Sequence, residues 1–345
     1  MDRNFCFDSP HLDHPLQPQR QICRTASSVD RHSIPSHIPG RGYQRHSAQK
    51  GRKDRHRTPQ GVISRRRSHT AAGLWRKFPL ARSESAEQIL SLTPDQLREF
   101  HYSRLSSNDI HVFLSGNITP RIEALVTDTF SRIASGTSFG MSSLSFAPPA
   151  ESPREVLVEL PGSQQSAVNM MIPAPGRLDS SFVSLRCAVT ALGGYFGSRL
   201  MLNIREARGL TYGISASLFG YPERSFISVA TQTACDSVKD VRRLILEEIE
   251  RMKDPASYTE DELMRLSRFL LSGLAATLDT PFSRMDFFKT KLYASTPDDY
   301  FEIQENFARR LDPANTSSKE AAELLVSTIA DNFNVSRRIT AVAGL

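Results

Sequence analysis

The segment over residues 192–218 passes from one hydrophobic pattern to another. Three glycines come first and favour a turn or a close approach between elements. Apolar residues then recur at helical spacing after Ser198, which is a favourable residue at a helix N-terminus. Gly209 interrupts this spacing, and glycine commonly ends a helix. We therefore predict a short helix that ends near Gly209 and whose apolar face holds Leu200, Met201 and Ile204.

The pattern beyond Gly209 has a period of two, which predicts a strand. A short helix that runs directly into a strand can bring two side chains to the same edge of a domain. Arg205 lies in the last helical turn and Tyr212 lies early in the strand, seven residues later. One side of the predicted strand would carry Leu210, Tyr212, Ile214, Ala216 and Leu218.

The same reasoning predicts elements on both sides of this segment. Threonine followed by proline opens two of the helices, because threonine is a good N-cap and proline suits the first turn. Glycine, serine and proline dominate residues 135–153, which predicts a linker. Helices are expected from Asp95, from Thr119, over 178–192, over 236–252, from Thr259 to a break at Pro281, and over 321–329; strands are expected over 110–114, as a pair over 155–160 and 166–172, over 225–233 and over 339–344.

The end of the chain repeats an order of elements seen earlier. The helix over 321–329 leads to the strand over 339–344, as the helix from Asp95 leads to the strand over 110–114. This similarity indicates an internal repeat.

Charge is distributed unevenly along the chain. Residues 1–80 hold 16 Lys and Arg but only 5 Asp and Glu, whereas the remainder holds 27 and 32. Residues 1–77 show no sustained period and few large apolar residues, so they cannot bury enough surface to offset the entropy of ordering. We predict a disordered basic tail. Its clustered basic residues, which could bind phosphate backbones or simply form a solvated surface, are Lys50, Arg52, Lys53, Arg55, Arg57, Arg65, Arg66 and Arg67.

The central segment resembles the C-terminal half of the insulinase and pitrilysin family of zinc metallopeptidases, which includes the mitochondrial processing peptidase. The resemblance is carried by the glycine-rich turn, S-R-L at 198–200, I-R-E at 204–206 and G-L-x-Y at 209–212. It implies an α+β fold with an antiparallel sheet and helices packed on one face. It also implies a remnant of a first peptidase half over 78–134 and a C-terminal domain over 154–345.

The family pattern places an arginine and a tyrosine at the active site, and these correspond to Arg205 and Tyr212. Attack on a peptide carbonyl builds negative charge on its oxygen, and a phenol or guanidinium donor aimed at that oxygen lowers the barrier. Without the resemblance, Arg205 would be interpreted as a surface arginine and Tyr212 as a half-buried strand aromatic. Arg199 and Arg208 are weaker candidates on the same helix.

The zinc-binding motif of the family, H-x-x-E-H, is absent from this sequence. The resemblance therefore implies that this chain binds no cofactor and that zinc belongs to a partner subunit or to a missing N-terminal half. Such a chain would not be catalytic alone. The histidines that do not form the motif are His11, His14, His32, His37, His46, His56, His69, His101 and His111.

Three functional hypotheses follow. The chain is a non-catalytic subunit that pairs with an H-x-x-E-H subunit and binds a peptide substrate in trans, or a truncated or frameshifted form of a full peptidase. The alternative is a basic-tailed binding or scaffold protein with nucleic-acid or other anionic partners.

The four cysteines are too scattered to indicate a disulfide framework. No apolar run is long enough to span a membrane. No clear signal peptide opens the sequence. The sequence leaves the location open, and we expect it to be cytoplasmic or periplasmic if the protein is bacterial.

Overall fold

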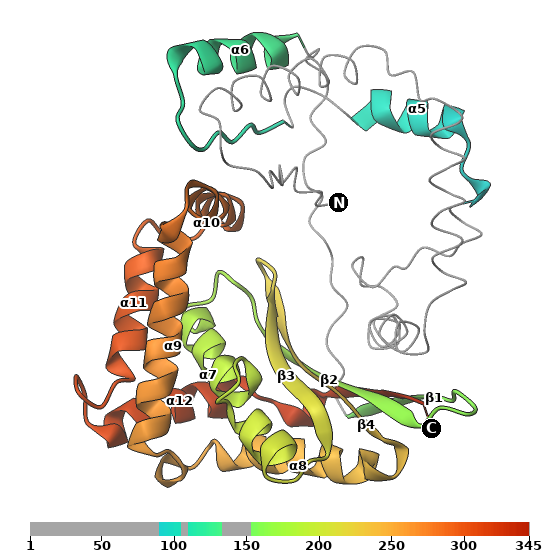
Figure 1. Cartoon of the computed structure of the whole chain (residues 1–345), viewed down its shortest axis with the longest axis vertical. Coiled ribbons are helices and arrows are strands. Elements are labelled where there is room, and N and C mark those ends of the chain that lie inside the picture. The colour runs from blue at the N-terminus through green and yellow to red at the C-terminus, as the bar shows by residue number, and fades with distance from the viewer. Residues whose placement is uncertain (1–89, 105–109, 133–152, 345) are drawn as a thin grey trace, which may run out of the picture. The chain divides into compact units, whose positions relative to one another are not determined.

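The computed structural model describes residues 90–104, 110–132 and 153–344, which fall into two compact units. Residues 90–132 belong to the first unit and residues 153–344 to the second (Figure 1). The predictions made for the basic tail over 1–77, and for all of the 135–153 linker except its last residue, lie outside the described residues. The predicted domain boundaries stay predictions.

The first unit contains two short helices with the predicted caps. Helix α5 spans Pro94–Arg104 and α6 spans Pro120–Ser131. The Thr93 hydroxyl accepts a hydrogen bond from Gln96 N at 3.2 Å, and Thr93 N donates to the Gln96 side chain at 2.9 Å. This reciprocal arrangement satisfies two donors at the helix start. At the start of α6, the Thr119 hydroxyl accepts a hydrogen bond from Ile122 N.

The strand predicted over 110–114 is wrong. These residues form no strand, and Val112 and Leu114 are exposed. A strand needs a neighbour to satisfy its backbone groups, and the described part of the first unit, residues 90–104 and 110–132, holds no strand that could pair with this segment. The repeat inferred from the sequence therefore keeps its helix but lacks its strand.

The second unit is built on a mixed five-stranded sheet with the order β1-β5-β2-β4-β3. Three of its four pairings are antiparallel, whereas β1 and β5 run parallel. The α+β prediction is confirmed. The expected pairing between the first two strands is wrong, because β5 inserts between them. The strands are β1 (Arg154–Val158), β2 (Gln165–Pro175), β3 (Thr211–Gly220), β4 (Arg224–Ala234) and β5 (Ile339–Ala343).

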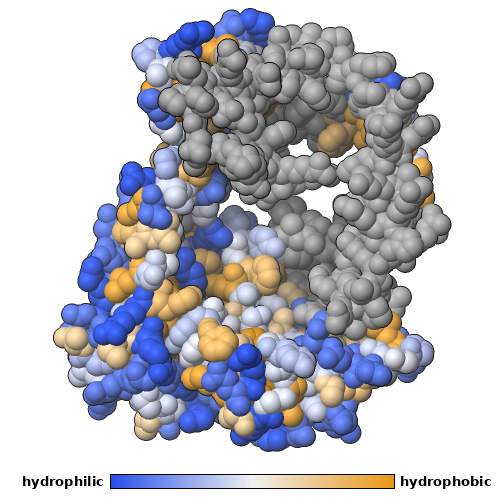
Figure 2. Space-filling model, viewed as in Figure 1, coloured by the Kyte–Doolittle hydropathy of each residue, from blue (hydrophilic) through white to orange (hydrophobic). Residues whose placement is uncertain are grey.

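Helices cover one face of this sheet, with α7 packed against β3 and α8 against β2 and β4 (Figure 1). The surface over α8 is largely hydrophilic (Figure 2), as expected for a helix that buries only one side. The α-helices of this unit are α7 (Phe182–Gly193), α8 (Val238–Arg251), α9 (Glu260–Asp279), α10 (Pro281–Ala294), α11 (Tyr300–Arg310) and α12 (Ser318–Asn332). A π-helix, η3, spans Met201–Glu206, and short 3-10 turns lie at Cys235–Ser237, Pro255–Ser257 and Val335–Arg337.

The core lies between the sheet and these helices. Alternate residues of the central strands, such as Met170 and Val229, contribute to it together with Leu185 of α7, Ile245 of α8 and Leu325 of α12. Each of these side chains is almost completely buried, which is the main source of stability in such a domain.

Helix α7 packs closely on β3 through a glycine. A Cβ atom on Gly193 would lie 2.5 Å from the backbone nitrogen of Ala216 and 2.8 Å from its Cβ. Only glycine permits this approach, so the structure confirms the prediction of close packing at this position. The helix begins four residues later than predicted, because Asp179 accepts hydrogen bonds from the amide and hydroxyl of Ser181 and so holds a turn.

Candidate functional site

Arg205 is carried by η3, the π-helix that links α7 to β3. Its hydrogen bonds include one from Ala207 N to Leu202 O, at 2.9 Å, across five residues. The sequence predicted a helix here but not its wider turn. Leu200 and Ile204 are fully buried as expected, and Gly209 ends the segment with a φ of +63°. Single π turns occur frequently at functional sites.

Ser198 lies at the start of this segment but does not cap it as predicted. Its carbonyl oxygen accepts a hydrogen bond from Leu202 N at 3.0 Å, so the helix begins there. Its hydroxyl group is buried and makes no hydrogen bond within the part of the chain that the structure describes.

Arg205 and Tyr212 lie at the same edge, as the sequence predicted. Arg205 Nε donates to the main-chain carbonyl of Tyr212 at 3.1 Å. The guanidinium also lies over the exposed ring of Phe196, 4.8 Å from its centroid, and its Nη1 lies 3.5 Å from a carboxylate oxygen of Glu206. The arginine is thus fixed on one side by the strand and on the other by an aromatic ring.

Tyr212 is exposed rather than packed with its neighbours in the strand. Its exposed fraction is 94%. The expectation that it shares a side with Ile214 is wrong, because a β-bulge between Thr211 and Ile214 adds one residue to β3 and changes the phase of the alternation. Ile214 and Ala216 beyond the bulge are buried as predicted.

The Thr211 hydroxyl group holds the bulge in place. It donates to Gln232 O at 2.6 Å and accepts from Gly213 N at 3.1 Å. Thr231 on β4 also reaches this hydroxyl, at 2.8 Å. These bonds replace ladder hydrogen bonds that the extra residue interrupts, and so they present the tyrosine at a fixed point of the edge.

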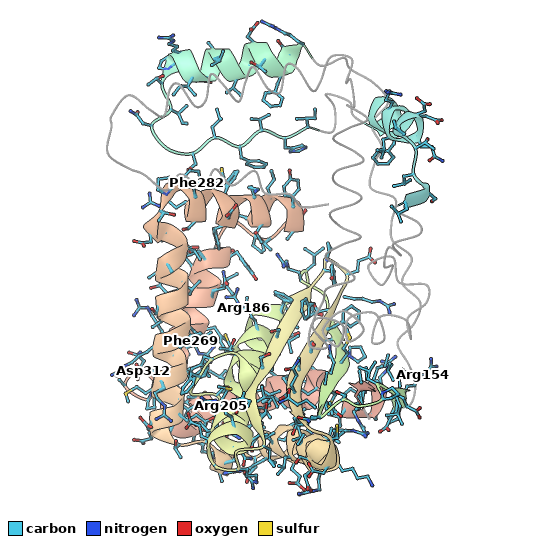
Figure 3. The ribbon with its side chains drawn as sticks, turned by 45° about the vertical axis from the view of Figure 1, so that its right-hand side comes forward. Arg154, Arg186, Arg205, Phe269, Phe282 and Asp312 are labelled. Carbon is cyan, nitrogen blue, oxygen red and sulfur yellow. The ribbon has the colours of Figure 1, made fainter. Side chains whose placement is uncertain are left out.

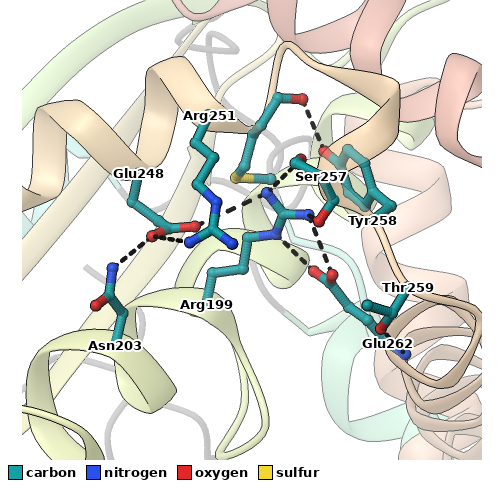
Figure 4. Close-up of polar contacts among 9 residues, drawn as sticks. Arg199, Asn203, Glu248, Arg251, Ser257, Tyr258, Thr259 and Glu262 are labelled. Atoms are coloured by element: carbon teal, nitrogen blue, oxygen red, sulfur yellow. Dashed lines mark hydrogen bonds and ion pairs between the residues drawn. The ribbon is translucent and has the colours of Figure 1, made fainter.

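Arg199, one of the weaker candidates, is a buried structural residue (Figure 4). Only 7% of its side chain is exposed, and it forms a fork with Glu262, with Nε to Oε1 at 2.6 Å and Nη2 to Oε2 at 3.1 Å. Ser257 accepts two further bonds from it, each at 3.0 Å. Its guanidinium lies 3.9 Å from the ring centroid of Tyr258. These contacts join the start of the Arg205 segment to α9.

A second connection joins the same segment to α8. Asn203 Nδ2 donates to Glu248 Oε2 at 2.6 Å, and Glu248 is only 3% exposed. The other oxygen of Glu248 lies 3.8 Å from Arg199 Nη1. Arg208, the remaining candidate, is exposed and donates to Asn203 O at 3.1 Å. Sequence reasoning missed the roles of Phe196, Asn203 and Glu248. Asn203 and Glu248 are 45 residues apart, and no local pattern marks Phe196 as the ring beneath Arg205.

Charge in this cluster is balanced by the carboxylates. Burial alone lowers the pKa of Arg199, but the hydrogen bond and charge of Glu262 outweigh it, so the pKa lies above its usual value. Burial raises the pKa of the Tyr258 phenol, and Arg199 offsets part of that rise. Arg199 is therefore always positively charged and Tyr258 is neutral at ordinary pH.

The described residues do not fit a zinc ion. Within 90–104, 110–132 and 153–344, no group of three or more His, Cys, Asp or Glu side chains is arranged to hold a metal. We therefore assign no reaction step of this chain to a metal. In the same part of the chain, no helix has the length and apolar character needed to cross a membrane.

Comparison with known proteins identifies relatives of part of this chain. Residues 91–270 match the model of the peptidase M16 inactive domain. An uncharacterised zinc protease of Mycobacterium tuberculosis is 30% identical over 218 residues, which cover 62% of this chain and 49% of that protein. An uncharacterised zinc protease of Streptomyces coelicolor is 26% identical over 188 residues, covering 52% and 40%. The chain thus spans about half the length of the curated relatives it matches.

Solved structures share the fold. A peptidase M16 inactive domain from Pseudomonas fluorescens has a TM-score of 0.75 and 19% identity, covering 94% of this chain and 75% of that one. The first half of the periplasmic protease PqqL from Escherichia coli has a TM-score of 0.69 and 14% identity, covering 96% and 72%. The family model spans more than half of the sequence, and the fold agrees with it. The chain therefore belongs to the M16, or insulinase, family of zinc peptidases and contains the inactive C-terminal domain of that family.

Proposed function

We propose that this chain is the non-zinc-binding half of an M16 peptidase and that it supplies Arg205 and Tyr212 to the substrate. The observation that carries the proposal is the hydrogen bond from Arg205 Nε to the Tyr212 carbonyl. This bond occupies Nε, and Nη1 lies 3.5 Å from a carboxylate oxygen of Glu206. Arg205 Nη2 makes no hydrogen bond within the described residues and is available to a substrate carbonyl.

Tyr212 contributes the second donor. Its side chain is exposed and makes no hydrogen bond to the described part of the chain, so its hydroxyl group can donate to the same oxygen. Two donors held at one strand edge provide the preorganised stabilisation that a developing oxyanion requires. Phe196 limits the movement of the guanidinium, because the cation and the ring attract each other.

The active half lies elsewhere in this proposal. Relatives are called zinc proteases and are about twice as long as the matched region, and the matched family model is named for an inactive domain. The missing half with H-x-x-E-H belongs to a separate subunit or to a longer form of this polypeptide. The chain alone then cleaves no peptide. The alternative of a basic-tailed nucleic-acid binder rests on residues outside the described ranges, and no contact in the structure favours it.

The experiment that tests this proposal is purification of the native protein from its own cells through a tag placed after Leu345. Mass spectrometry then identifies its polypeptides, and a peptide-cleavage assay measures turnover. We expect an H-x-x-E-H sequence in the same complex or the same polypeptide, with cleavage that depends on Arg205. Cleavage by the 345-residue chain alone, or turnover unaffected by Arg205→Ala in the complex, would contradict the proposal.

A further inference from the structure

Two arginines of the second unit both lie near Tyr300 of α11, and neither belongs to the site described above. Arg177 follows β2, and its Nη2 donates to Gly220 O at the end of β3, at 3.2 Å. Arg186 lies on α7 and donates from Nη2 to the side-chain oxygen of Gln304 on α11. Arg186 and Arg205 are labelled at separate points in Figure 3.

The contacts of these arginines place them in one corner of the second unit. The Arg177 guanidinium lies 5.7 Å from the ring centroid of Phe182, the first residue of α7. Phe182 and Arg186 are four residues apart and so lie on the same face of the helix. Gln304, the partner of Arg186, is 2% exposed and donates to Tyr300 O at 3.0 Å. We call Arg177, Arg186, Tyr300 and Gln304 the two-arginine cluster.

In the part of the chain that the structure describes, the positive charge of this cluster has no counter-charge. Neither Arg177 nor Arg186 forms an ion pair there, and the hydrogen-bond acceptors of both are neutral oxygens. The nearby carboxylate of Asp179 is occupied by the amide and hydroxyl of Ser181. Both side chains are partly exposed, so their positive charge can act on an anion that approaches from solvent.

A buried donor in the cluster also lacks an acceptor. The Nε atom of Arg177 is shielded from solvent and makes no hydrogen bond within the described residues. Native structures satisfy nearly all buried donors, and an exception calls for a ligand, ion or water. Burial raises the pKa of the Tyr300 phenol, although both arginines counteract part of this effect, so the tyrosine adds no negative charge at ordinary pH.

We propose that Arg177 and Arg186 form a binding site for a carboxylate group of a polypeptide. A guanidinium group matches the planar, two-oxygen shape of a carboxylate. That the ligand is a polypeptide rests on the proposed function, in which this half of the enzyme binds a peptide substrate. The site lies away from Arg205, so it selects acidic substrates through a part of the peptide distant from the bond that is cleaved.

Isothermal titration calorimetry on the full chain tests this inference with three short peptides. The first is acetyl-Ala-Glu-Glu-Ala-amide, the second has Gln in place of both Glu, and the third is the Gln peptide with a free C-terminal carboxylate. We expect one of the two carboxylate-bearing peptides to bind at least about tenfold more tightly than the neutral one, the scale of one charge-assisted hydrogen bond. Which of them does so distinguishes a side-chain carboxylate from a chain terminus.

Substitutions test whether Arg186 is responsible for the preference for carboxylate-bearing peptides. Arg186→Gln should abolish the preference for a carboxylate, and Arg186→Lys should keep part of it. Arg243→Gln is the matched control, because it removes the same charge from an exposed arginine on α8 that pairs with Asp240 and Glu247. Circular dichroism confirms that each variant is folded. Equal affinity for all three peptides, or a preference that survives Arg186→Gln, would overturn the inference.

The Arg205→Ala variant separates this inference from the proposed function. If both hold, the variant turns over substrate slowly in the complex but keeps the ratio of affinities between the three peptides, because Arg205 acts on the carbonyl that is cleaved. Normal turnover by this variant in the complex contradicts the role of Arg205 and leaves the carboxylate site standing. If Arg186→Gln alone removes the difference in affinity between the carboxylate-bearing and neutral peptides, the carboxylate site is supported, whatever the result for Arg205.

Discussion

The side chain of Arg205 is bound to the backbone of Tyr212, with 3.1 Å between Nε and the carbonyl oxygen. The two residues proposed to act on one substrate oxygen are thus held by a direct bond between η3 and β3. A shift of the strand edge moves the guanidinium with it. This coupling makes the effects of substitutions at the two positions interdependent.

Replacement of Arg205 by alanine should lower turnover in the complex with the H-x-x-E-H half. We expect a loss of about a hundredfold in kcat, the scale of removing one oxyanion donor. Arg208→Ala is the control, since Arg208 is exposed on the same segment and bonds only to Asn203 O in the described structure. Steady-state kinetics measure both. Equal activity of the two variants would show that the assigned role of Arg205 is wrong.

Tyr212→Phe should reduce kcat without changing stability. The substitution removes only the hydroxyl group, and the side chain is 94% exposed, so folding loses almost nothing. A loss of about tenfold to a hundredfold in kcat is expected if the hydroxyl group donates in the transition state. Thermal unfolding of the chain alone should be unchanged. A fall in melting temperature together with normal kcat would instead indicate a structural tyrosine.

Arg199→Met should destabilise the chain strongly. It leaves Glu262 and Glu248 without the buried cation that they surround, and breaking a buried pair in this way costs about 3–5 kcal/mol. Arg309→Met removes an exposed arginine paired with Glu305 and should leave the unfolding midpoint nearly unchanged. Urea unfolding measures both variants. Equal midpoints would mean that the cluster in Figure 4 contributes little to folding.

Gly193→Ala should destabilise the contact between α7 and β3. The added Cβ would lie 2.5 Å from Ala216 N, and overpacking of this kind costs about 1–3 kcal/mol. Gly273→Ala is the matched control in the middle of α9, where a Cβ meets no atom within 4 Å. That change should be neutral or stabilise the helix by up to about 1 kcal/mol. Opposite shifts in the urea midpoint are expected, and a stabilising Gly193→Ala would refute the packing argument.

Stability should fall as the pH rises above 9 because of Cys187. Burial raises the pKa of its thiol from 9.0 to about 12. A group whose pKa is raised in the folded state contributes to the free energy of unfolding. This contribution is complete below the pKa of the unfolded state and is lost as the pH rises towards the pKa of the folded state. From about pH 9 to about pH 10 the free energy of unfolding should fall by about 1 kcal/mol from this group. In the Cys187→Ala variant, the free energy of unfolding measured with urea should no longer show this fall with pH. An unchanged dependence on pH would contradict the assignment.

The fold and the placement of Arg205 were accessible from the sequence for local reasons. Helix caps are encoded within four residues, so Thr93, Thr119 and Thr259 marked their helices correctly. The short path from η3 into β3 was equally local, and it brought Arg205 to the backbone of Tyr212 as expected. Family resemblance added the significance of that pair, which composition and spacing alone did not provide.

The features that the sequence could not reveal depend on distant partners. The position of β5 beside β2 joins residues more than a hundred and sixty positions apart, and no pattern within either strand specifies it. The network around Arg199 likewise unites η3, α8 and α9. The segment over 110–114 had the alternation of a strand but no described neighbour to pair with, and alternation by itself does not form a sheet.

Because of the β-bulge at Thr211, the arrangement of the site depends on the number of residues in this part of the chain. Three steps along β3, from Thr211 to Ile214, correspond to two along β4. Deleting Thr211 would restore regular pairing and place the tyrosine on the same side of β3 as Ile214, while leaving both the arginine and the tyrosine in the protein. A homologue could therefore retain both arginine and tyrosine and still lose the arrangement, so the number of residues between them is as informative as their identity.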